Sequence, residues 1–532
     1  KAYCVHIIYG RVKSQNVKGG SKMELTEHSV CICETAASGT VQAMADGDII
    51  VPDIKPDILK LLQVDAEACV TDRYVENGRL TVCGRVDYTV LYLPDRENEK
   101  IRSIKTSMEF RQLADAKGAG EDSFPIVSAS VERVEFNAVN SRKIRLRAII
   151  SIGYEVCCIR EIGLCTDCMA EKAECRRKLV KFESAADISE HEFSIKEAIE
   201  VPSGQNSVNE ILKTDVCISD TEYKTVTGKA IVKGCARICV LYTDDEGGIH
   251  YIESETPFTE VFDIDGAGED AICDIEYSTA GVRPAAEADS DGDMRIVTVD
   301  IDVIASVKAT EETEEEILSD CFVPYMSTKC GYETTVLTET VERPSGQYNV
   351  REVIDFPSGV PGVSGVYNVV TNAVVTKAEI QRKKLLCEGR IETFILYLTD
   401  TAENPVYSIK KDIKFSYMLE CENDCSDCMA KVKVNVRHIS YNLNAAGALE
   451  LRCLLEIDAK LMRQNSISNI SSVECSERES DNSIIICFVK NGDTVWDIAK
   501  RYGVPQKSII ESNDMDENAV LTGGEKLFIP PF

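Results

Sequence analysis

An internal repeat constrains the fold of this chain more than any other feature of its sequence. Three segments begin with a glycine, at Gly84, Gly234 and Gly389, and continue through a mostly apolar run to a Leu-Tyr pair. The pairs lie at 91–92, 241–242 and 396–397, so they recur every 150 to 155 residues. This period predicts three copies of one domain, each long enough to bury a core of its own.

Each copy also contains a long alternating segment, over residues 143–153, 295–304 and 449–458. Strict alternation of apolar and polar side chains is typical of an antiparallel strand with one buried face and one solvated face. With turn signals between such strands, the pattern predicts an antiparallel sandwich.

A third shared element begins at Pro52, Pro202 and Pro344, each followed by apolar residues at helical spacing. This spacing predicts one short helix per repeat. The gap from the proline to the repeated glycine is 32 residues in the first two copies and 45 in the third. We therefore expect 13 extra residues in the third copy, in the loop around 361–365.

We predict a mainly β, multidomain protein with three antiparallel β-sandwich-like repeats, each with a short helix, and a small C-terminal β-α-α-β domain. The segments between the repeats are charged or acidic, and the last one is rich in Ser and Asn, so we expect linkers and a final flexible tether. The predicted order is an N-terminal segment (1–40), repeat 1 (41–156), a linker (157–192), repeat 2 (193–309), an acidic linker (310–336), repeat 3 (337–462), a Ser/Asn-rich linker (463–483) and the C-terminal domain (484–532). Residues 1–22 resemble translated upstream sequence, and we expect the natural chain to start at Met23.

Composition excludes several classes of function. The 532 residues carry a formal net charge of −30, which argues against binding nucleic acid or an anionic membrane surface. The sequence shows no apolar run of membrane-spanning length and no signal peptide, so we predict no direct membrane insertion. Without an export signal, the 23 cysteines are predicted to be reduced thiols.

The C-terminal segment carries the most specific motif. An apolar run at 484–489 predicts a strand, Asn491-Gly492-Asp493 a turn, and the following apolar spacing a helix that ends at Gly503. A second helix begins near Pro505 and ends at Asn513, and 527–529 is the return strand. These positions match the Gly-Asp-Thr, Trp, Ile-Ala, Tyr-Gly, Asn and Ile-Pro positions of LysM domains, and the segment closely resembles that family.

In LysM domains that bind N-acetylglucosamine polymers, the ligand lies across the first turn and the loop before the second strand. The resemblance therefore implies a binding site for a partner or ligand, made by Asn491, Gly492, Asp493, Thr494, Trp496, Asn513, Gly523 and Ile529. The alternative is that Trp496, Ile498 and Ile529 are core residues of a small domain. The loop is acidic in this chain, at Asp514, Asp516 and Glu517, which neither requires nor forbids a sugar.

The order of three such repeats and a LysM domain is similar to the SipL-like spore-coat assembly proteins of Clostridia, which carry SPOCS domains. This resemblance implies a non-enzymatic scaffold in the mother-cell cytoplasm, at the forespore surface and in the spore coat. Its LysM domain would bind stage IV sporulation protein A, the coat basement ATPase, and its repeats would bind other coat proteins. The alternative is an envelope protein whose LysM domain binds peptidoglycan or N-acetylglucosamine glycan, which would require export.

The cysteines raise further possibilities. Cys421, Cys425 and Cys428 have the C-x₃-C-x₂-C spacing of an iron–sulfur loop, but they lie between β elements with no barrel pattern around them. Cys165–Cys168 and Cys425–Cys428 each offer half a structural zinc site, and the linker 157–192 holds enough cysteines for a whole one. Oxidative cross-linking in a coat is another possible use. The five histidines are dispersed, and we predict no catalytic residues, no metal and no cofactor.

Overall fold

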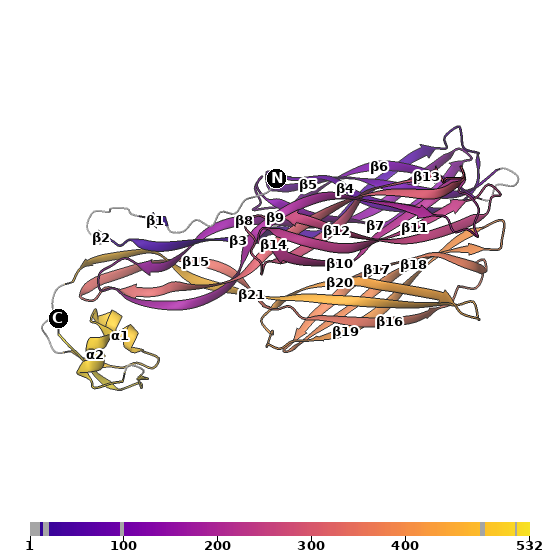
Figure 1. The fold of residues 1–532 in the computed structure, drawn as a ribbon. Helices are drawn as coiled ribbons and strands as arrows, with labels where there is room; N and C mark the ends of the chain where they lie inside the picture. The colour runs from indigo at the N-terminus through magenta and orange to yellow at the C-terminus, as the bar shows by residue number, and fades with distance from the viewer. Residues whose placement is uncertain (1–10, 14–20, 96–100, 479–484, 517–518, 532) are drawn as a thin grey trace.

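The computed structural model describes the chain except for residues 1–10, 14–20, 96–100, 479–484, 517–518 and 532. Figure 1 shows a broad β-sheet head, a narrower stalk of long strands that projects from it, and a small helix-containing domain at the far end of the stalk. Within the described residues, no helix is long and apolar enough to cross a membrane.

Each repeat is a two-layer antiparallel sandwich. One layer is a three-stranded meander, and the other is centred on a much longer strand. The meanders are β4 (Ile58–Glu76), β5 (Arg79–Pro94) and β6 (Arg102–Asp115); β10 (Glu210–Val226), β11 (Lys229–Thr243) and β12 (Ile249–Asp263); and β17 (Val363–Gln381), β18 (Lys384–Thr399) and β19 (Val406–Glu420).

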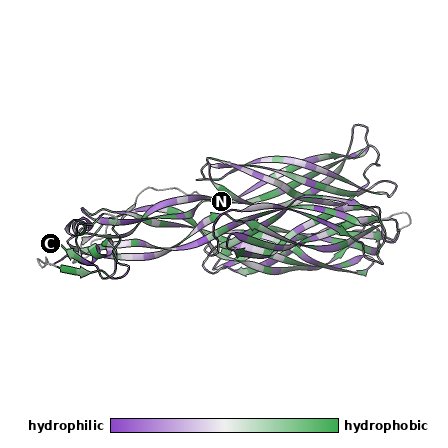
Figure 2. Cartoon of the chain, turned by 90° about the horizontal axis from the view of Figure 1, so that it is seen from below, coloured by the Kyte–Doolittle hydropathy of each residue, from purple (hydrophilic) through white to green (hydrophobic). Residues whose placement is uncertain are grey.

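The second layers have the long strands β8 (Lys143–Cys168), β14 (Met294–Phe322) and β21 (Leu449–Glu477) in their centres. Their partners are β3 (Leu25–Ile50) and β7 (Phe124–Asn140) in repeat 1, β9 (Glu174–Glu200) and β13 (Ile272–Ala288) in repeat 2, and β15 (Met326–Glu342), β16 (Ser345–Ile354) and β20 (Met429–Leu443) in repeat 3. The predicted sandwiches are confirmed, and Figure 2 shows the hydropathy alternating along the strands.

The glycine that marks each repeat has a packing role. The ring of Phe110, Phe258 or Phe415 on the neighbouring strand lies over it. A Cβ added at Gly84, Gly234 or Gly389 would come within 2.3 to 2.5 Å of that ring. The position therefore has no room for a side chain, which explains why a glycine interrupts each apolar strand.

The predicted short helix of each repeat is wrong. Within the described residues, helices occur only in the C-terminal domain, and the segments that follow Pro52 and Pro202 continue into strands β4 and β10. Bulges at Ile58/Lys60 and Leu61/Gln63 shift the alternation of β4, so apolar residues recur at a helix-like spacing on an extended backbone.

The predicted insertion in repeat 3 is also wrong. Pro344 lies between β15 and β16, which both pair with β21, so it interrupts a strand rather than following one. The residue equivalent to Pro52 and Pro202 is Pro357, because it follows the end of β16 as they follow β3 and β9. Pro357 precedes Gly389 by 32 residues, so the spacing is the same in all three repeats.

The three meanders meet at one buried cluster in the head. Leu91, Leu241 and Leu396, from the three Leu-Tyr pairs, belong to this cluster. The tyrosine of each pair holds a loop of its own repeat: the Tyr92 hydroxyl donates to Pro56 O (3.1 Å), the Tyr242 hydroxyl to the side-chain oxygen of Gln205 (2.7 Å) and the Tyr397 hydroxyl to Pro361 O (3.3 Å). The repeated dipeptide therefore joins the repeats to one another and secures each one internally.

A buried polar group lies at the same centre. Gln63, Lys213 and Asn368 each pair with the leucine of their repeat's Leu-Tyr pair, and all three are buried. The Lys213 ammonium lies 3.0 Å from a carboxylate oxygen of Asp65 in repeat 1 and 2.8 Å from one of Asp215 in its own repeat. Burial of the ammonium would lower the pKa of Lys213, but the Asp215 and Asp65 carboxylates outweigh this effect and raise it.

The predicted linkers are strands, so their assignment as linkers and a flexible tether is wrong for the described residues. The long strands pass beyond the sandwiches as three ribbons, β3/β8, β9/β14 and β15/β21, which form the stalk (Figure 1). Residues from all six strands make one stalk core: Val30, Ile32, Leu164, Val180, Phe182, Ile317, Leu337 and Ile467.

These strands were predicted as linkers because their buried and exposed residues alternate but few of their residues are apolar. Of the acidic run 311–316, the glutamates at 312, 314 and 316 are exposed, and Lys181 pairs with Glu314. In the Ser/Asn-rich segment, Ile467, Ile470 and Val473 point inward between small polar residues. The low hydrophobicity of these segments is therefore typical of a linker, although each one forms a half-buried strand.

Two short strands precede the head. β1 (Arg11–Lys13) pairs with β3, and β2 (Ser21–Lys22) pairs with β21. The rest of residues 1–20 lies outside the described residues, and a natural start at Met23 stays a prediction.

Candidate functional site

The C-terminal domain has the predicted β-α-α-β order: β22 (Ile485–Phe488), α1 (Val495–Tyr502), α2 (Gln506–Ser512) and β23 (Lys526–Ile529). Thr494 and Asp497 form a capping box at the start of α1, because each side chain accepts a hydrogen bond from the backbone N–H of the other. Gly503 ends α1 in the left-handed conformation, with φ of 69°.

Four of the predicted site residues form an exposed rim. Gly492 has φ of 88°, which a glycine adopts easily, and it turns the chain toward Thr494. The loop before β23 comes close to this turn: a Cβ added at Gly523 would lie 1.8 Å from the side-chain oxygen of Asn491. Asn491, Gly492, Thr494 and Gly523 are therefore neighbours on one edge, as the resemblance implies.

The other predicted site residues are structural. The Asn513 side chain donates to Ile509 O (2.7 Å) and Phe528 O (2.8 Å) and accepts from Phe528 N (2.7 Å), so it ties α2 to β23. Asp493 pairs with Arg501 at 2.8 Å, which joins the turn to the end of α1. Trp496 and Ile529 are buried in the core of the domain, so the geometry supports the core alternative for both.

Trp496 also joins the domain to the stalk. Its indole N–H donates to a carboxylate oxygen of Asp320 (3.0 Å), and its ring meets that of Phe322 edge to face, with centroids 5.2 Å apart. Lys500 forms an ion pair with Asp320, and the Tyr332 hydroxyl donates to the same Asp320 carboxylate (2.8 Å). Burial alone would raise the pKa of Asp320, but the bonds from Lys500, Trp496 and Tyr332 outweigh it and lower the pKa.

A second contact comes from helix α2. Gln506 donates to the two carboxylate oxygens of Glu174, from its backbone at 3.0 Å and from its side chain at 2.9 Å. The backbone N–H of Tyr325 donates to Gly503 O at 2.7 Å. The sequence did not point to Asp320, Phe322 or Glu174 as contacts, because they lie in segments that looked like linkers.

An apolar face remains open on the other side of the domain. Cys487, Leu527 and Ile529 point toward the helices, so the alternating residues of β22 and β23 point away from them. Ile486 is 58% exposed and lies opposite Phe528, while Phe488 is 60% exposed. The Lys526 ammonium lies 5.8 Å from the centre of the Phe488 ring. We call Ile486, Phe488 and Phe528 the outer face.

The cysteines of segment 157–192 do not assemble into one four-ligand site. The Cys157 sulfur faces Lys308, 3.8 Å from its ammonium, whereas Cys165 and Cys168 lie in a separate cluster at the stalk tip with Cys321 and Cys475. Within the described residues, no two cysteines are joined by a disulfide bond.

Comparison with protein families identifies both parts of the chain. The SipL SPOCS domain matches residues 57–139, 207–283 and 363–444, and the LysM domain matches residues 488–530. Each SPOCS match covers the meander and the following strand of one repeat, while the long ribbons of the stalk lie outside the matched segments.

Comparison with curated proteins and with solved structures gave no match. The family matches connect the chain with sporulation and the spore coat, and they give it a LysM module of the kind that binds glycans or proteins. The three SPOCS repeats and the C-terminal LysM domain place this chain in the SipL-like family of sporulation proteins.

Proposed function

We propose that this protein is a non-enzymatic scaffold of the spore coat, which acts in the mother-cell cytoplasm at the forespore surface. Its LysM domain docks on stage IV sporulation protein A, and its three repeats hold other coat proteins. Family membership supports the setting, and the exposed outer face of the LysM domain supports docking on a protein.

The outer face carries the argument for a protein partner. Ile486 and Phe488 are large apolar side chains, more than half exposed, on a domain whose other apolar residues are mostly buried. Apolar and aromatic side chains of this kind supply the centre of protein–protein interfaces. The face also points away from the helices that contact the stalk, so docking does not require the domain to leave the stalk.

The exposed rim favours a second candidate, binding of an N-acetylglucosamine glycan. Asn491, Gly492, Thr494 and Gly523 come together where glycan-binding LysM domains hold their ligand. The rim and the outer face consist of different residues, so the two candidates can be separated by substitution.

The test is capture of the full-length chain by immobilised stage IV sporulation protein A and, in parallel, by peptidoglycan. We expect capture by the protein, and a loss of at least tenfold in affinity when Ile486→Asp and Phe488→Asp are combined, because charges would then replace the apolar centre. Ile54→Asp is the matched control, since Ile54 is 91% exposed in the head.

Capture by peptidoglycan alone, lost with Asn491→Ala but not with the outer-face variant, would replace the proposal with the glycan alternative. Unchanged capture of the outer-face variant by stage IV sporulation protein A would move the docking site to another part of the chain.

A further inference from the structure

The loop between β19 and β20 differs in chemistry from its two counterparts in the other repeats. The three loops share their backbone hydrogen bonds: the first residue donates to the preceding hairpin, and the eighth donates to the fifth. The bonds are Ala116 N to Gly78 O (2.9 Å) and Ser123 N to Gly120 O (3.1 Å); Ile264 N to Gly228 O (3.0 Å) and Ala271 N to Gly268 O (3.4 Å); and Cys421 N to Lys383 O (2.8 Å) and Cys428 N to Cys425 O (2.9 Å).

Packing alone does not require cysteine at these positions. Repeat 1 fills them with Ala, Gly and Ser, and repeat 2 with Ile, Gly and Ala, on the same backbone. In repeat 3 all three are cysteines, at Cys421, Cys425 and Cys428. The three thiols of the third loop are therefore not required by the backbone fold that the loops share.

The side chains of this loop converge with a carboxylate from the stalk side of the repeat. The sulfurs of Cys421 and Cys425 and a carboxylate oxygen of Glu342, on β15, all lie within 4.8 Å of one another. Cys425 is fully buried and Cys421 nearly so, while Cys428 is partly exposed and lies within hydrogen-bonding reach of Cys425.

These separations suit a single ion rather than a cluster. A tetrahedral zinc ion with bonds of about 2.3 Å holds its sulfur ligands about 3.8 Å apart. A [4Fe–4S] cluster holds its thiolates farther apart, because each one binds a different iron atom. Three cysteines and one carboxylate complete four-coordination and leave no open position, which is the pattern of a structural site.

The surrounding residues already hold the loop in place. The Glu342 carboxylate accepts the backbone N–H groups of Glu422 (2.8 Å) and Asn423 (3.1 Å). Arg463 on β21 donates to both carboxylate oxygens of Asp427 at 2.8 Å. Outer-shell hydrogen bonds of this kind orient the ligands of metal sites.

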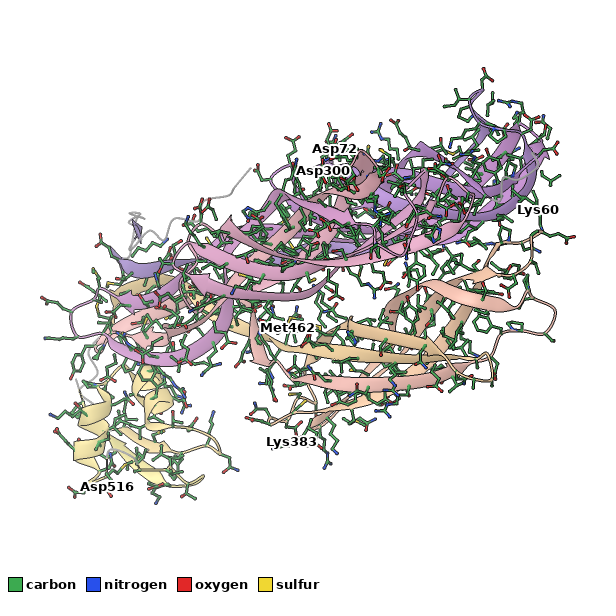
Figure 3. All side chains as sticks on the ribbon, turned by 45° about the vertical axis from the view of Figure 1, so that its right-hand side comes forward. Lys60, Asp72, Asp300, Lys383, Met462 and Asp516 are labelled. Carbon is green, nitrogen blue, oxygen red and sulfur yellow. The ribbon has the colours of Figure 1, made fainter. Side chains whose placement is uncertain are left out.

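We propose that Cys421, Cys425, Cys428 and Glu342 bind one zinc ion. On binding, three thiols release three protons and their thiolates form Zn–S bonds, while the carboxylate supplies one oxygen. The ion would fasten the loop to β15 at the end of repeat 3 nearest the stalk, between the regions of Lys383 and Met462 labelled in Figure 3. Because thiols bind zinc as thiolates, affinity should rise with pH.

The test is the metal content of the full-length protein, purified under reducing conditions, loaded with zinc and desalted. We expect about one zinc per chain, and at least a tenfold loss of affinity with Cys421→Ser and Cys425→Ser combined. Cys453→Ser is the control, because Cys453 is a buried cysteine of the same repeat. No bound zinc, or zinc retained by the double variant, would overturn the proposal.

A second measurement keeps the proposal testable if the double variant does not fold. Cobalt replaces zinc in the wild-type chain, and its spectrum should show thiolate charge-transfer and tetrahedral bands. Cys428→Ser should weaken the charge-transfer band by about a third, because one of three thiolates is removed, and Glu342→Gln should shift the tetrahedral bands. Bands that disappear instead with Cys321→Ser would place the metal at the stalk tip and overturn the assignment.

Discussion

The head and the stalk are made from the same long strands but are stabilised in different ways. In the head, each repeat has a core between its own two sheets, and among the described residues the hydrophobic cluster that the repeats share there is the small one around Leu91, Leu241 and Leu396. In the stalk, the cores contain residues from all three repeats at once. A single repeat can therefore bury its own sandwich core, but the stalk forms only when all three ribbons come together.

This difference bears on the LysM domain. Its contacts with the stalk include Glu174 on β9 and Asp320 and Phe322 on β14, all in repeat 2, and Tyr325 in the turn that follows β14. The position of the binding module thus depends on the β9/β14 ribbon of the stalk and on the turn at its end.

Removal of the buried lysine at the centre of the head should have the largest effect. Lys213→Ala leaves the Asp65 and Asp215 carboxylates without their cation, and breaking a buried ion pair costs about 3 to 5 kcal/mol. We expect the free energy of unfolding, measured with urea, to fall by that amount. Lys196→Ala is the control, because Lys196 is exposed. Equal stability of the two variants would mean that the polar centre does not hold the repeats together.

Acid should weaken the junction between head and stalk. Glu155 of repeat 1 pairs with Lys308 of repeat 2 at 3.6 Å and with Lys431 of repeat 3 at 2.8 Å. Burial opposes ionisation, but these lysines and their hydrogen bonds prevail and lower the pKa of Glu155 to about 2, from an ordinary value of 4.5.

Because the folded pKa lies below the unfolded one, this stabilisation is present above pH 4.5 and is lost as the pH falls toward 2. Glu155→Gln should therefore lower stability by about 2 kcal/mol at pH 7 and reduce its loss between pH 4.5 and 2. Thermal unfolding across this range measures the effect, with Glu121→Gln as an exposed control. A wild-type pH profile that Glu155→Gln leaves unaltered would contradict the assignment.

Loss of the stalk contact should have the smallest effect, confined to the LysM domain. Asp320→Ala removes the acceptor of Trp496, Lys500 and Tyr332, which should cost about 1 to 2 kcal/mol of local stability. Hydrogen exchange of the α1 amides should then become about tenfold faster, while the head is unchanged. Asp516→Ala is the control, because Asp516 lies on the side of the domain away from the stalk (Figure 3). Equal exchange rates in the two variants would show that the domain does not rest on Asp320.

The sequence predicted much of the head and of the LysM domain, and particular residues show why. The Leu-Tyr pairs and the alternating strands were correctly read because their apolar residues are large and regular. The helix after Pro52 was wrongly predicted because bulges in β4 give a strand the spacing of a helix. Trp496 and Ile529 fit a core as well as a binding site from sequence alone, and only their burial favours the core.

The sequence by itself determined the three repeats, their sandwich strands and the LysM module, because local alternation, turns and caps act over a few neighbouring residues. Only the tertiary structure showed that the long strands form a stalk, that the LysM domain contacts Asp320 and that Glu342 lies close to the cysteines of the third loop. The reason is physical, because each of these features joins residues far apart in the chain. Each stalk strand also has too few apolar side chains for its sequence alone to predict that it is buried.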